Sequence, residues 1–161
     1  MSAIDHLIHA NARYAETFPG PRPLRPKLRL TVIACMDSRL DLFGALGLEI
    51  GDAHLIRNAG GLPTEEVLRS LAISQRSLGT REVVLIHHTE CGMDGFDDAG
   101  FRAQLAETGM VPTWDVPGFT DLHDTMRKSI RTVRECPWLP NRDDVRGFIF
   151  DVATAKIEEV V

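Results

Sequence analysis

Apolar and polar residues are arranged along this chain in a way that predicts strands and helices in turn. Short apolar runs, partly β-branched, have the length and composition of strands, and the run from Val83 to Ile86 is continuous, as in a strand buried on both faces. The expected strands are 28–34, 53–57, 82–87, 147–152 and 157–161, the last two forming a terminal hairpin. The expected core helices are 41–48, 64–79, 97–107 and 120–134.

The first 27 residues follow a different pattern. Apolar residues recur at helical spacing from Ile4 to Phe18 and predict an amphipathic helix, which Ser2 and Asp5 cap at its start. The segment 20–26 is rich in proline and is expected to be an extended arm. A helix on such an arm either packs on a partner subunit or folds back on its own domain, and the sequence leaves both open.

Strands that alternate with helices predict a single α/β domain spanning 1–161. We expect 1–27 to form the N-terminal helix and proline-rich arm, and 28–161 to form the core. The core should contain a central, mostly parallel four-stranded sheet with helices on both faces and a C-terminal antiparallel hairpin strand. In such sheets ligands bind beyond the carboxyl ends of the strands, at the point where the strand order reverses.

Composition narrows the class of protein. A chain of 161 residues with 43% hydrophobic content can form one core. The net charge of −5 gives no reason to expect a nucleic-acid or membrane partner, and no apolar run is long enough to span a bilayer. Residues 1–13 mix acid, histidine and polar residues with apolar ones and are not expected to form a signal peptide. Three cysteines without a pairing pattern predict a reducing, cytoplasmic location.

Three potential metal ligands stand at the ends of two predicted strands. Cys35 lies just past the first strand, and His88 and Cys91 lie at and just past the third. Two thiols and one imidazole form a three-ligand set for Zn²⁺, one per chain, and leave a tetrahedral ion one open position for chemistry. His87 should point to the opposite side of its strand, while His54 and Cys136 have no sequence relation to the site.

Asp37 and Arg39 follow the first thiol and bring a carboxylate and a guanidinium to the open position. They could form a surface ion pair without a role. In the functional interpretation, Asp37 orients a zinc-bound water and Arg39 holds Asp37 by a bidentate contact. If Asp37 were released from Arg39, it could bind zinc as a fourth ligand and close the site. Above about pH 7 the zinc-bound water becomes hydroxide, a stronger ligand, which would displace the carboxylate and reopen the site.

Together the motifs Cys-x-Asp-x-Arg and His-x-x-Cys-Gly resemble those of the β-class carbonic anhydrases, in particular the short actinobacterial members. The resemblance extends to 57–60, 69–71 and 147–152. It implies a zinc lyase in which a zinc-bound hydroxide reversibly hydrates carbon dioxide to bicarbonate and a proton. It also implies that Cys35, His88 and Cys91 bind zinc, that Asp37 and Arg39 form the catalytic dyad, and that the chain forms a homodimer or homotetramer.

Two alternatives share this zinc site. Carbonyl sulfide and carbon disulfide hydrolases resemble the same family and use the same ligands, so the sequence does not separate them from a carbonic anhydrase. A non-catalytic zinc module, structural or redox, is an alternative of another class. A structural site would take four ligands and would not need Arg39. A redox module would need two thiols close together, whereas Cys35 and Cys91 come from separate strands.

Overall fold

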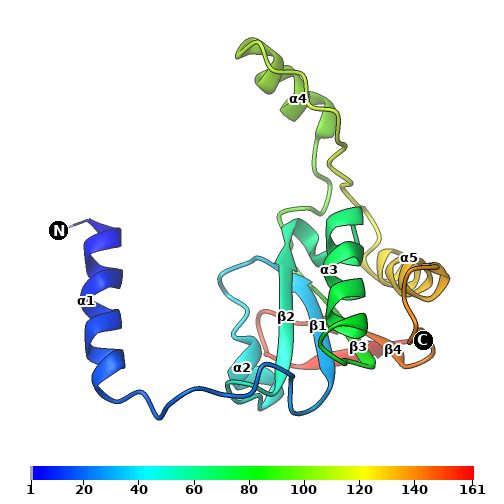
Figure 1. Ribbon diagram of the computed structural model, residues 1–161. Helices are drawn as coiled ribbons and strands as arrows, with labels where there is room; N and C mark the ends of the chain where they lie inside the picture. Colours follow the sequence, from blue (N-terminus) through cyan, green and yellow to red (C-terminus); the bar gives the residue numbers. More distant parts are fainter. Residues whose placement is uncertain (1) are drawn as a thin grey trace.

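A five-stranded sheet forms the centre of the structure (Figure 1). The computed structural model describes residues 2–161. The strands are β1 (Leu30–Cys35), β2 (Ala53–Asn58), β3 (Glu82–His88), β4 (Val145–Phe150) and β5 (Ile157–Val160). They lie in the order β2-β1-β3-β4-β5, with the first four parallel and β5 antiparallel to β4. The predicted fold class, including the terminal hairpin, is confirmed.

The described residues also form five α-helices and one short 3₁₀ helix. They are α1 (Ala3–Glu16), α2 (Leu42–Leu46), η1 (Ala59–Gly61), α3 (Glu65–Arg76), α4 (Asp98–Glu107) and α5 (Leu122–Glu135). Each predicted helix is present, and most are shorter than the sequence pattern indicated. Helix α2 ends early because Gly47 adopts a left-handed conformation with φ 64°, and Gly79, with φ 80°, lies in the turn after α3.

The two faces of the sheet are covered unequally. Helices α3 and α5 pack on one face, where Ile33 and Leu85 contribute to a core with Leu71 and Met126. The opposite face is covered by the short helix α2 and by loops, with Leu42 and Ile86 among the buried side chains. Helices therefore lie on both faces, as predicted, although the two long ones share a single face.

The strand order reverses between β1 and β3, which are neighbours. The chain leaves β1 through α2 on one face to reach β2, and it leaves β3 through α5 on the other face to reach β4. The carboxyl ends of β1 and β3 therefore border the crevice in which an open α/β sheet binds its ligands.

Two segments stand away from this body, α1 on its extended arm and α4 with the chain around it (Figure 1). Neither helix buries a residue. The capping box predicted for α1 is confirmed, since Asp5 N donates to Ser2 Oγ at 3.1 Å and Ser2 N donates to Asp5 Oδ2 at 2.8 Å. The sequence left open whether this helix packs on a partner subunit or folds back on its own domain. In the structure α1 does not fold back.

The described chain contains no helix that is both long and apolar enough to cross a membrane. Cys35, Cys91 and Cys136 are all buried free thiols.

Candidate metal centre

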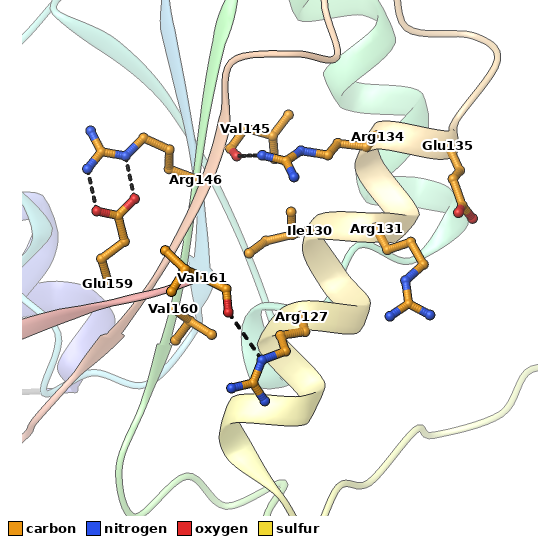
Figure 2. A pocket seen from close by; sticks show the side chains of 10 residues that line it. All are labelled: Arg127, Ile130, Arg131, Arg134, Glu135, Val145, Arg146, Glu159, Val160 and Val161. Carbon is orange, nitrogen blue, oxygen red and sulfur yellow. Dashed lines mark hydrogen bonds and ion pairs between the residues drawn. The ribbon is translucent and has the colours of Figure 1, made fainter.

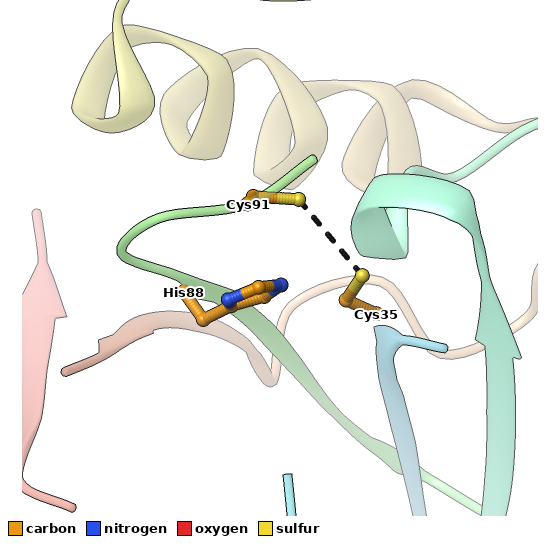
Figure 3. A group of neighbouring side chains, drawn as sticks. All are labelled: Cys35, His88 and Cys91. Atoms are coloured by element: carbon orange, nitrogen blue, oxygen red, sulfur yellow. Dashed lines mark hydrogen bonds between the residues drawn. The ribbon is translucent and has the colours of Figure 1, made fainter. Parts of the chain in front are cut away.

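The three predicted ligands meet at the crevice between β1 and β3 (Figure 3). Cys35 ends β1, His88 ends β3, and Cys91 lies in the turn that follows. All three are buried, and their ligand atoms lie within 4.8 Å of one another. The two Sγ atoms are 3.9 Å apart, close to the separation of about 3.8 Å that a tetrahedral ion with Zn–S bonds of about 2.3 Å requires. The group could therefore hold a metal ion.

The ring of His88 is oriented for a ligand at Nε2. Its Nδ1 lies 2.9 Å from Thr89 O, and because a carbonyl oxygen only accepts, Nδ1 carries the proton. Nε2 is then an unprotonated acceptor, and it is buried without a hydrogen-bond partner among residues 2–161. Buried polar atoms rarely lack a partner. A metal ion between the two thiols would provide one, so the residues present fit a zinc ion.

A tight turn after β3 brings Cys91 back towards His88. Glu90 in this turn adopts a left-handed backbone with φ 55°, which is uncommon for a residue other than glycine. Arg39 fixes the turn from outside, because its Nη2 donates to Glu90 O at 2.9 Å and its Nη1 lies 3.3 Å from Glu90 Oε2. Arg39 thus connects the loop after β1 to the turn that carries Cys91.

Arg39 also holds Asp37 by a bidentate contact. Its Nε donates to Oδ1 at 3.0 Å and its Nη2 donates to Oδ2 at 2.8 Å, and the Arg39 backbone N–H adds a bond to Oδ1 at 2.9 Å. These hydrogen bonds hold the pKa of Asp37 well below its usual range, so the carboxylate is ionised. Oδ2 lies 3.8 Å from His88 Nε2. The carboxylate is therefore beside the site while both its oxygens are bonded to Arg39.

Two further residues shape the centre, and no role for either was predicted from the sequence. The Arg57 guanidinium donates to Cys35 O at 2.8 Å and to Asp37 O at 2.6 Å, which fixes the loop after β1. Gly61 lies so close to β1 that a Cβ would stand 2.7 Å from Cys35 N, and its φ of 66° is left-handed. The sequence offered only a weak signal for Arg57. It belongs to the segment 57–60 that resembles the family, but the atoms it binds are backbone carbonyls, which the sequence does not reveal.

The thiols bear on the redox alternative. The sequence argument against this alternative was that Cys35 and Cys91 come from separate strands, but that argument does not hold, because neighbouring parallel strands end at the same edge of the sheet and the two Sγ atoms are 3.9 Å apart. A redox thiol, however, needs a lowered pKa. Burial raises the pKa of Cys91 to about 11, and a cation would be needed to stabilise its thiolate.

His87, His54 and Cys136, which were not expected to bind the metal, lie outside the ligand group. His87 is fully buried on the α5 side of β3, where its Nε2 lies 3.5 Å from Ser129 Oγ, and burial lowers its pKa to about 4. The His54 ring contacts Ser74 Oγ at 2.7 Å. Cys136 belongs to the core on the α3 and α5 face.

Comparison with known proteins finds similarity to carbonic anhydrases. The family model described as carbonic anhydrase matches residues 30–128. The chain is 47% identical to "Beta-carbonic anhydrase 1" of Mycobacterium tuberculosis, with 99% of each chain covered. The crystal structure of carbonic anhydrase from Streptococcus mutans matches with a TM-score of 0.92 and 41% identity, over 100% of this chain and 99% of that one.

A more distant relative is a carbon disulfide hydrolase of Acidithiobacillus thiooxidans, which is 34% identical over 80% of this chain and 75% of its own. The fold, the cysteine and histidine group and these likenesses agree. The chain belongs to the β-carbonic anhydrase family.

Proposed function

We propose that this protein is a zinc-dependent carbonic anhydrase, which interconverts carbon dioxide and bicarbonate. The observation that carries the proposal is the buried group of Cys35, His88 and Cys91. Beside it lies the Asp37 carboxylate, which is hydrogen-bonded to Arg39 and is not directed at the group as a fourth ligand. A purely structural zinc site would use a fourth protein ligand. Here the nearest candidate, Asp37, has both oxygens in hydrogen bonds to Arg39.

A zinc ion bound by these three residues would lower the pKa of a water towards about 7 and so supply hydroxide at neutral pH. The residues around it orient the reaction. Asp37 is ionised and acts as a hydrogen-bond acceptor for the nucleophile, directing its lone pair at the substrate carbon. Arg39 and Arg57 keep Asp37 and its loop in position, so no reorganisation is needed when the substrate enters.

The contact between Arg39 and Asp37 supports an open site. In the closed alternative, Asp37 would leave Arg39 and become the fourth metal ligand. X-ray absorption on the zinc-loaded protein tests this, since an oxygen from water and one from carboxylate give different scattering beyond the first shell. We expect water as the fourth ligand at neutral pH and closure by Asp37 at lower pH.

Stopped-flow measurement of carbon dioxide hydration by the purified zinc protein tests the proposed activity. Parallel assays with carbonyl sulfide and carbon disulfide are needed because one relative is named carbon disulfide hydrolase. Fast hydration of carbon dioxide with little turnover of the sulfur substrates supports the proposal. The reverse ratio would make the protein a sulfur-substrate hydrolase, and bound zinc without any turnover would make it a non-catalytic zinc module.

We also propose a homodimer or homotetramer, located in the cytoplasm. Helix α1 supports self-association, because Ile4, Leu7 and Ile8 are each more than 60% exposed on a helix that stands away from its own domain (Figure 1). The free thiols support a reducing compartment. Sedimentation at micromolar concentration should give a species larger than the 17.9 kDa chain, and a lone monomer would contradict the assembly.

A further inference from the structure

A basic hollow lies at the amino edge of the sheet, the edge opposite the metal centre. Its volume is about 550 Å³, and its lining includes Arg25 from the proline-rich arm, Arg29 from just before β1, and Arg81 from just before β3. The strands between the two edges are six or seven residues long, which separates the hollow from the metal centre by about 20 Å. The hollow is therefore no part of the catalytic crevice.

The positive charge of the hollow is not neutralised by the protein. No carboxylate lines it, and within residues 2–161 none lies within 4.0 Å of the guanidinium nitrogens of Arg25, Arg29 or Arg81. Three like charges around one concave surface repel one another and concentrate the positive potential. A bound anion would relieve this repulsion.

The groove between α5 and β5 provides a comparison, because arginines line it as well (Figure 2). There, among the residues that the structure describes, three of the four guanidinium groups, all but that of Arg131, have protein partners. Arg146 binds Glu159 at 2.7 and 2.5 Å, Arg134 donates to Val145 O at 2.9 Å, and Arg127 donates to Val161 O at 3.3 Å. Arg146 thus connects β4 to β5, Arg134 connects α5 to β4, and Arg127 connects α5 to the residue after β5. The three arginines of the hollow make no such side-chain contacts within the described chain.

The backbone at Arg29 is held in an unusual conformation that sets two of these arginines side by side. Arg29 has a left-handed φ of 53°, a position that normally favours glycine or asparagine. Its carbonyl accepts hydrogen bonds from Arg81 N at 2.7 Å and from Glu82 N at 3.3 Å. A long cationic side chain thus stands at a position where a small residue would fit the backbone better, which points to a use for the side chain.

The far wall of the hollow is rigid. Gln75 is buried, its Nε2 donates to Asn141 O at 2.8 Å, and its Oε1 accepts from Asn141 N at 3.0 Å. Asn141 Nδ2 also donates to Thr80 O at 3.3 Å. The Arg25 side chain runs past Gly79, where an added Cβ would meet its Cδ at 3.9 Å. The arginines therefore surround a surface that is already formed.

We infer that this hollow binds a small, multiply charged phosphate compound, with Arg25, Arg29 and Arg81 contacting its oxygens. Guanidinium groups match phosphate oxygens because their N–H groups donate in a planar fork. A ligand with at least two negative charges balances three cations better than a monoanion such as bicarbonate does. The inference does not depend on the proposed activity, because the hollow and the metal centre share no residue.

The test uses the full-length zinc-loaded protein and inorganic pyrophosphate as the probe, at constant ionic strength set with sodium chloride. Backbone amide shifts of Gly79, Thr80 and Arg81 report binding at the hollow itself, so binding of the probe at zinc does not confuse the result. The matched variants are Arg29→Gln and Arg81→Gln, with Arg131→Gln on the exposed surface of α5 as the control for loss of one positive charge.

We expect saturable shifts of these amides at millimolar pyrophosphate or below. Each hollow variant should bind about tenfold more weakly, the equivalent of one lost charge-assisted hydrogen bond, while Arg131→Gln changes binding less than about twofold. Carbon dioxide hydration should be unchanged in all three variants. Linear, unsaturated shifts, or equal weakening in Arg131→Gln, would overturn the inference.

Discussion

The two edges of the sheet use the same residue type in opposite ways. At the carboxyl edge, Arg39 is bonded to a carboxylate and Arg57 to backbone carbonyls. At the amino edge, Arg25, Arg29 and Arg81 have no carboxylate partner in the described chain. An arginine whose donors are used by the protein positions its neighbours, whereas one whose donors are free is available to a ligand. The number of arginines alone would not have distinguished the two edges.

The difference extends to burial. The carboxyl edge withdraws its reactive atoms from solvent: Cys35 is 4% exposed, Cys91 6%, and His88 0%. Burying these polar atoms without a bonding partner lowers the free energy of unfolding, and a bound metal ion would offset that loss. The amino edge leaves its charged groups exposed, where water solvates them, so its ligand contributes less to folding. The following variants test this contrast, starting with the largest expected effect.

Cys91→Ser should remove most of the bound zinc and with it nearly all activity, because serine at neutral pH does not supply an anionic ligand. Metal analysis of the purified protein measures the zinc content directly. Cys136→Ser is the control, since that thiol is also buried but belongs to the core on the other face. Retention of one zinc per chain in Cys91→Ser would remove Cys91 from the ligand set.

Asp37→Asn should keep zinc but lower kcat/KM by about 100-fold, because the amide cannot serve as an anionic acceptor towards the nucleophile. The matched control is Asp98→Asn, which also disturbs an aspartate paired with arginine, at 2.8 Å, but on the α4 segment. Stopped-flow kinetics and metal analysis on the same samples separate loss of chemistry from loss of zinc. Wild-type turnover in Asp37→Asn would exclude the carboxylate from the mechanism.

The sequence was sufficient to predict that Cys35, His88 and Cys91 come together, because each carries its chemistry in its side chain and lies at a recognisable strand end. Asp37 and Arg39 were predictable for a similar reason, since they are two residues apart and near Cys35. Their bidentate contact needs little more than the local loop. Membership of the β-carbonic anhydrase family followed from the same motifs and is confirmed.

What the sequence did not predict depends on backbone positions far apart along the chain. Gly61 and the backbone of Cys35 come together only when η1 is folded against β1. Arg29 and Arg81 become neighbours through the register that pairs Leu30 with Glu82. Residue types indicate chemistry, but parallel pairing decides which distant residues share an edge.

Gly61→Ala should lower the free energy of unfolding by about 2–4 kcal/mol, because the methyl group adds a clash with the backbone of β1 to the strain of a left-handed φ. Gly47→Ala isolates the strain, since Gly47 has φ 64° and nothing within 4 Å of the added Cβ. It should cost about 1 kcal/mol. Urea unfolding of both variants, with zinc saturating, provides the comparison. Equal losses would mean that close approach at the metal edge is unimportant.

The smallest effect is expected at the amino end of the sheet, where Thr31, Ser74 and Thr80 form a buried hydroxyl network that His54 joins through Ser74 Oγ. Burial lowers the pKa of His54, so near pH 6 the unfolded chain binds more protons at this residue than the folded one. His54 therefore subtracts stability as the pH falls through its ordinary value of about 6.5, and subtracts nothing well above it.

His54→Gln keeps a hydrogen-bonding side chain beside Ser74 but cannot titrate. The decrease in the free energy of unfolding between about pH 7.5 and about pH 5.5 should be smaller in this variant than in the wild type, by less than about 1 kcal/mol because the ring is only partly buried. Urea titrations at the two pH values measure the difference, and the carboxylates and other histidines cancel between the two proteins. A larger decrease in the variant would mean that protonated His54 stabilises the network, as it would if it served the basic amino edge as a further cation.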